Sequence, residues 1–122
     1  MQPSRSDLIQ MFVLDAIADD YENLAHIKID VTSLSSRAGL AVEPGEVTDA
    51  LIRLIERGLA TAFNLRGWNP PEEYPGIPPS CDIDEYYFWT TSEGKKVQLA
   101  DYPEWPFDED NNRRNDWQAP SR

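Results

Sequence analysis

The residue types that most often do chemistry are scarce in this chain. It has one histidine, His26, and one cysteine, Cys81, so neither has a second histidine or cysteine at zinc-ligand spacing. A nucleophilic Cys81 would need a nearby base, whereas its neighbours Asp82 and Asp84 disfavour the thiolate by charge repulsion. For His26, a structural or surface role is expected rather than catalysis.

Two acidic segments bring hard oxygen ligands close together, at residues 82–85 and 108–111. Neither matches an EF-hand loop, which needs a glycine at its sixth position and a distant glutamate. The six glycines are scattered along the chain, so the sequence contains no glycine-rich phosphate loop. The sequence therefore predicts no enzyme, no cofactor and no bound metal.

Length and charge limit the function further. The 122 residues have room for one domain, and 40% hydrophobic residues rule out wholesale disorder. Lysine and arginine number 11 against 22 aspartate and glutamate, and the resulting net charge of −11 repels DNA and anionic membranes. No apolar run approaches the ~18 residues of a membrane span, and the N-terminus predicts no signal peptide. One cysteine is typical of a reducing, cytoplasmic setting.

The first predicted helix covers residues 7–24, with Ser4 or Ser6 as its cap and Asp7 in its first turn. Its apolar residues occupy more than half of the helix circumference, which is more than an ordinary surface helix shows. Either the domain itself buries this helix, or part of it packs against a second subunit. The second alternative predicts a homodimer through helix 7–24.

The other expected elements follow from periodicity, caps and breakers. The alternating segment 26–31 predicts a strand, and Pro44 and Gly58 are placed to begin and end an amphipathic helix. In chain order, we expect a strand, a short helix, an amphipathic helix, two strands and a short helix at residues 26–31, 32–39, 43–58, 61–65, 86–90 and 91–99.

Two segments lack a clear regular pattern. Residues 66–85 contain five of the ten prolines, which favour extended conformations and exclude the middle of a sheet. Loops of this length are usually functional or disordered. Residues 101–122 form a polar, proline-containing tail without a core of its own, whose Trp105, Phe107 and Trp117 can dock on the domain or on a partner.

Three motifs, in this order, resemble a winged helix-turn-helix. Residues 34–40, Leu-Ser-Ser-Arg-Ala-Gly-Leu, resemble the first motif helix and its turn, usually written L-A-x-x-x-G-L. Residues 43–59 resemble the second motif helix, and 87–94 resemble the Y-x-L-T-x-x-G segment that leaves the wing in MarR-like and PadR-like transcription regulators. The likeness covers residues 7–100. It implies an α+β, mainly α domain over residues 1–100, with an enlarged proline-rich wing at 66–85 and a C-terminal tail.

The resemblance also implies a DNA-binding transcription regulator whose second motif helix enters the major groove. The residues that would contact DNA are Arg37, Thr48, Arg53 and Arg66. The sequence departs from the family at this helix, because Glu43, Glu46 and Asp49 stand where a DNA-binding helix carries neutral or basic groups. The wing is acidic as well, so ordinary DNA binding is disfavoured.

Winged helices also serve as protein-interaction modules, and this is the function that the sequence favours. The predicted partner-binding residues are Glu43, Glu46, Asp49, Trp68 and Tyr74, on the acidic helix and the wing. The aromatic residues around the second strand, at positions 86, 87 and 89, are either further anchors or cover for the core. The partner is a protein or a second copy of the chain, with DNA-binding transcription regulation as the alternative.

Overall fold

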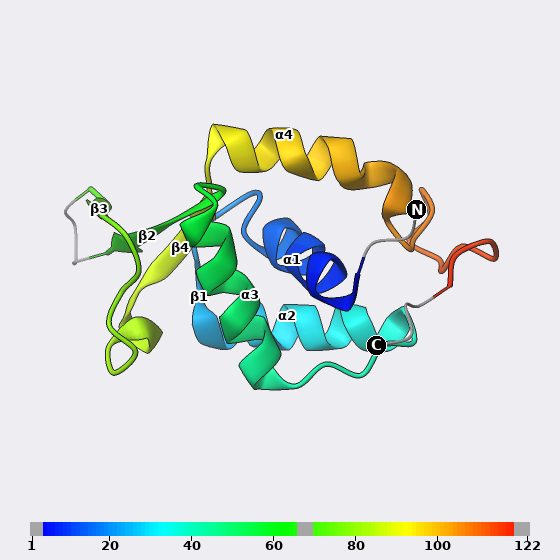
Figure 1. Ribbon diagram of the computed structural model, residues 1–122, viewed down its shortest axis with the longest axis horizontal. Helices are drawn as coiled ribbons and strands as arrows, with labels where there is room; N and C mark the ends of the chain where they lie inside the picture. The colour runs from blue at the N-terminus through cyan, green and yellow to red at the C-terminus, as the bar shows by residue number, and fades with distance from the viewer. Residues whose placement is uncertain (1–3, 66–69, 119–122) are drawn as a thin grey trace.

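Helix α1, Arg5–Ala16, lies between the other helices in this computed structural model, which describes residues 4–65 and 70–118 (Figure 1). It contacts α2, Leu24–Arg37, below it in this view, α4, Ser92–Asp101, above it, and α3, Pro44–Glu56, at its side. A small sheet closes one end of these helices. The described residues therefore form a small α+β fold with four α-helices and a four-stranded antiparallel sheet.

The first helix begins earlier and ends earlier than its sequence predicts. The hydroxyl of Ser4 accepts a hydrogen bond from the Asp7 backbone N–H at 3.1 Å and caps α1. The predicted helix 7–24 is wrong beyond Ala16, because the chain bends over residues 17–20, where the Asp20 carboxylate accepts the Tyr21 N–H at 2.7 Å. Such local bonds of aspartate compete with helix hydrogen bonds and favour turns. The chain then enters β1, Glu22–Asn23.

The predicted strand 26–31 and the separate short helix after it are wrong, because both segments belong to α2. The Asn23 side chain accepts the His26 N–H at 2.9 Å and starts this helix. Leu24, Ile27 and Val31 are buried at helical spacing, whereas Ile29, which a half-buried strand would place with them, is 65% exposed. The helix ends before Gly39, whose φ of 81° supports the expected stop there.

The amphipathic helix after this turn is confirmed as α3. Pro44 occupies its first turn, and Val47, Leu51 and Leu54 are buried on one side. Gly58 follows its end with φ 74°, the left-handed conformation that glycine adopts without strain.

The sheet has the order β1-β4-β2-β3 and is antiparallel throughout. The two predicted strands are confirmed as β2, Ala60–Asn64, and β4, Tyr87–Thr90. The sequence missed β3, Glu72–Tyr74, which lies within the proline-rich segment. This strand pairs only at the edge of the sheet, where flanking prolines remove no ladder hydrogen bond. A 3₁₀ turn, Ile83–Glu85, leads from it toward β4.

The last helix is also confirmed, with Thr91 as its cap. The Thr91 hydroxyl accepts the Gly94 backbone N–H at 3.0 Å. A short 3₁₀ helix, Tyr102–Glu104, then leads into the tail. None of the described helices is long and apolar enough to cross a membrane.

The tail docks on the domain and completes its core. Phe107 and Trp117 are 3% and 8% exposed, and the Trp105 ring meets the Phe12 ring edge-on at 5.5 Å between centroids. The apolar residues of α1 are therefore buried within the chain itself. The expectation of a homodimer rested on an uncovered face of this helix, and that face is covered.

Candidate functional site

The acidic helix that the sequence singled out is held at its first turn by its own carboxylates. The Glu43 N–H donates to the Glu46 carboxylate at 3.0 Å. Arg5 of α1 donates to both oxygens of Glu46, at 2.8 and 2.9 Å, and also to the carbonyl of Ala41. The hydrogen bond to Glu46 is the main cause that raises the pKa of Arg5. Glu46 therefore fixes α3 against α1.

The remaining acidic residues of this helix face solvent. Glu43 and Asp49 are exposed, together with Pro44 and Gly45, and Thr48 is half-buried. Two of the three predicted carboxylate contacts thus lie on an accessible surface. We call the surface formed by Glu43, Pro44, Gly45 and Asp49 the acidic face of α3.

An open groove of about 700 Å³ runs between α1 and α3. Its lining includes two basic residues, Arg5 and Arg53, and two acidic residues, Asp49 and Glu56. The apolar side chain of Ile52 also lines it. The described residues that line this groove include carboxylates and arginines but no histidine or cysteine.

A second groove, of about 310 Å³, lies between α1 and α2 and brings Asp15 and Asp30 to its two sides. Desolvation is the largest cause that raises the pKa of Asp15, and the negative charges of Asp19 and Asp30 raise it further. Ser33 and Arg37 line the same groove. The pattern of a nucleophile with an adjacent histidine base is absent from these lining residues.

The arginines that would contact DNA do not assemble into a basic strip among the described residues. Arg37 stacks over the Phe107 ring at 4.8 Å from its centroid and donates to the Asn111 carbonyl, so the tail occupies it. Arg53 is exposed, but Asp49 and Glu56 share its groove. Arg66 lies outside the described residues.

The two aromatic residues predicted as wing anchors have different outcomes. Tyr74 is half-buried, meets Tyr86 edge-on at 5.0 Å between centroids, and packs against the core. Its ring therefore stabilises the fold, in addition to any contact that it makes with a partner. Trp68 lies outside the described residues.

His26 and Cys81 do not belong to a larger cluster of metal-binding side chains among the described residues. Cys81 is exposed, and exposed His26 lies 3.1 Å from the Glu22 carboxylate, four residues away. Within the part of the chain that the structure describes, no three His, Cys, Asp or Glu side chains gather to hold a metal ion.

The structure brings together four aromatic residues that the sequence did not group: Tyr21, Phe63, Tyr87 and Trp89. The sequence placed Tyr21 on the first helix and named only Tyr87 and Trp89 as possible anchors. The signal that could have grouped them is strand alternation, because residues 87 and 89 point to one side of their strand. Strand pairing then adds Phe63, which lies opposite Tyr87.

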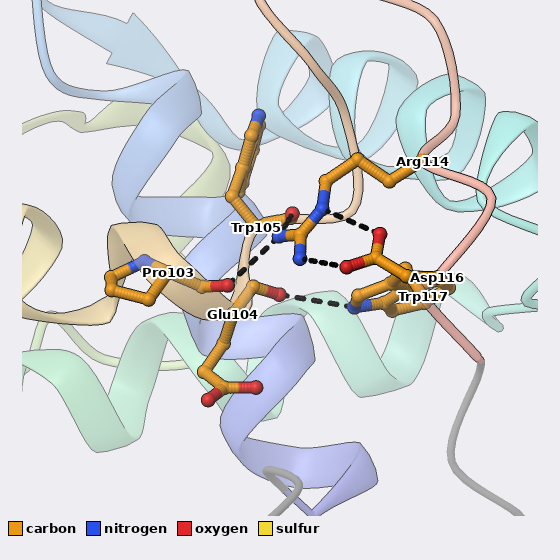
Figure 2. A network of polar contacts seen from close by, with 6 residues as sticks. All are labelled: Pro103, Glu104, Trp105, Arg114, Asp116 and Trp117. Atoms are coloured by element: carbon orange, nitrogen blue, oxygen red, sulfur yellow. Dashed lines mark hydrogen bonds and ion pairs between the residues drawn. The ribbon is translucent and has the colours of Figure 1, made fainter.

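The tail is fastened by a clasp built around Arg114 (Figure 2). This guanidinium donates to the carbonyls of Pro103 and Trp105, each at 2.8 Å, and pairs with Asp116 at 2.9 and 3.1 Å. The hydrogen bond from Arg114 is the main cause that lowers the pKa of Asp116. The Trp117 indole N–H donates to the Glu104 carbonyl at 3.0 Å. The clasp is structural, since it bonds one part of the tail to another.

No protein-family model matches the chain, and neither a curated protein nor a solved structure is significantly similar to it.

Proposed function

We propose that this chain is a non-enzymatic winged-helix module that binds a protein partner in a regulatory role. The order of elements supports the winged-helix assignment. Helix α1 is followed by the short strand β1, then by the pair α2 and α3, and then by the ribbon β2–β4. Strand β1 pairs with β4, and β3 extends the ribbon as an enlarged wing.

The turn between α2 and α3 supports the same assignment. The Leu40 N–H bonds the Ser35 carbonyl at 2.8 Å across Gly39, which closes α2 as in a Schellman motif. The chain then passes through the buried Val42 to the cap of α3 at Glu43. This connection leaves the acidic face of α3 outward, in the position of a recognition helix.

One observation favours protein over DNA as the partner: the exposed start of α3 is acidic, and Arg37, the nearest cation in the motif, is committed to the tail. DNA carries one negative charge per ~1.7 Å of duplex axis and is bound mainly through lysine and arginine contacts to its phosphates. Glu43 and Asp49 would meet those phosphates. The nearby Arg5 and Arg53 already share their groove with Asp49 and Glu56. A partner with basic or neutral groups meets no such repulsion.

The second candidate is a DNA-binding transcription regulator of the MarR-like or PadR-like kind. The helix-turn-helix order of α2 and α3 favours it, and Thr48 and Arg53 would be its base and phosphate contacts. It requires the charge repulsion at Glu43 and Asp49 to be overcome, and therefore ranks second.

Site-specific photocrosslinking separates the two candidates. A photoreactive phenylalanine analogue at Asp49 is expected to give discrete protein adducts in cells that express the chain. The same analogue at Glu109, an exposed position in the tail, is the control and should not give them. Adducts at position 49 that nuclease removes, or equal protein adducts at both positions, would contradict the proposal.

A further inference from the structure

Four aromatic side chains on the outer side of the sheet lie outside the hydrophobic core. The pairing Thr61↔Trp89 and Phe63↔Tyr87 places the rings of Phe63, Tyr87 and Trp89 on one side. Tyr21 precedes β1 and joins them, at 5.0 Å from the Phe63 centroid and 4.7 Å from that of Trp89. We call Tyr21, Phe63, Tyr87 and Trp89 the aromatic face.

This face is distinct from the side of the sheet that meets the helices. Ala60, Ala62, Phe88 and Thr90 alternate with the aromatic residues along β2 and β4 and are all buried. The four aromatic residues are each half-buried, and they lie outside the core cluster. In Figure 1 the labelled α-helices lie to one side of the sheet. Helix α4 reaches the aromatic face through the Lys95 side chain.

A cation of the chain itself already rests on this face. The Lys95 ammonium of α4 lies 5.8 Å from the centroid of the Trp89 ring, within the range of a cation–π interaction. The Trp89 indole N–H donates to the Ala18 carbonyl at 3.3 Å, which fixes the orientation of the ring. The Trp89 ring is therefore oriented so that it can receive a positive charge.

The charges around the face favour a basic ligand. Glu73 pairs with Phe63 in the register of β2 and β3 and so lies on the same side, where it is exposed. Asp19 and Asp20 are exposed next to Tyr21, and the whole chain carries a net charge of −11. Nucleic acid bases also stack on aromatic rings, but their phosphates would meet these carboxylates.

We propose that the aromatic face binds a basic, arginine-containing segment of a partner protein. One of its guanidinium groups stacks on Trp89 in place of Lys95, and Glu73 pairs with another. This inference rests on the proposed function as a protein-interaction module. It names the partner's chemistry and places contact on a surface other than the acidic face of α3.

The test is an NMR titration of the full chain, labelled with nitrogen-15. The probe is a blocked peptide of alternating arginine and glycine, and its counterpart has glutamate in place of arginine. We expect saturable shifts of the Trp89 indole N–H and of the amides of β2 and β4 with the arginine peptide alone. Shifts centred on Glu43 and Asp49 instead would overturn the inference while leaving the proposed function in place.

Two lysine variants provide a matched comparison. Lys95→Ala vacates the Trp89 ring, whereas Lys96→Ala removes the same charge one residue away, from an ammonium paired with Glu93 at 3.3 Å. An exposed cation–π contact corresponds to about a two- to fivefold change in affinity. We expect Lys95→Ala to tighten binding of the arginine peptide by that factor beyond Lys96→Ala. Equal effects of the two variants, or no saturable binding, would overturn the inference.

Discussion

Substitution of Gly94 by alanine tests how closely α4 approaches the rest of the domain. A Cβ atom at this position would lie 2.2 Å from the Leu59 carbonyl oxygen and 2.3 Å from the Thr90 hydroxyl. Real Cβ atoms essentially never approach closer than 3.0 Å, so α4 or Leu59 must move by the difference of 0.8 Å. The Leu59 carbonyl also accepts the Thr91 N–H at 3.0 Å, and such a movement strains that hydrogen bond.

The expected magnitude follows from two opposing effects. Forcing an extra methyl group into a closely packed site costs about 1–3 kcal/mol, and a strained backbone hydrogen bond adds about 1 kcal/mol. Alanine recovers up to about 1 kcal/mol through its higher helix propensity. We therefore expect Gly94→Ala to lower the free energy of unfolding by about 1–3 kcal/mol.

Gly45→Ala is the matched control, because a Cβ atom at Gly45 meets nothing within 4 Å. Only the helix propensity of the residue changes at this position, so the free energy of unfolding should rise by up to about 1 kcal/mol. Urea denaturation followed by tryptophan fluorescence measures both variants. If Gly94→Ala matched the wild type, or if the two substitutions moved the midpoint in the same direction, the close approach would be refuted.

Three further predictions use the same denaturation assay. Ser35→Ala should raise stability by about 1 kcal/mol, because the fully buried Ser35 hydroxyl has no hydrogen-bond partner among the described residues, whereas exposed Ser33→Ala should change little. Trp117→Ala should cost about 3 kcal/mol, because this ring is buried in the core, and Trp89→Ala on the half-buried aromatic face should cost less. Desolvation and nearby carboxylates raise the pKa of Asp15 above its unfolded value, so the contribution of Asp15 to stability falls as the pH rises between its unfolded and folded pKa values. Asp15→Asn should therefore raise stability by up to about 0.5 kcal/mol at pH 7 and not at all at pH 3.

The elements that the sequence predicted well have local signals that do not depend on the rest of the fold. Pro44 and Gly58 bracket α3, and Thr91 caps α4 through its own side chain. Segment 26–31 fits two periods, because Ile27 and Val31 satisfy a helix as well as a strand. Burial settles the choice by leaving Ile29 exposed, and burial depends on packing against α1 and α3.

The site was predictable only in its composition. The acidic character of α3 is visible in the sequence, but the pairing of Glu46 with Arg5 joins residues 41 positions apart. The contact of Arg37 with Asn111 spans 74 positions. Long-range contacts of this kind follow from tertiary packing and have no local pattern. The aromatic face likewise depends on the pairing of β2 with β4, which brings Phe63 opposite Tyr87.

The central proposal is that this chain binds protein rather than DNA through its exposed surface. The most direct measurement is a fluorescence-anisotropy titration of labelled, mixed-sequence duplex DNA with the full chain at physiological salt. The account predicts binding no tighter than the weak non-specific range of ~10⁻⁴ M. A sub-micromolar affinity that weakens steeply with added salt would contradict it.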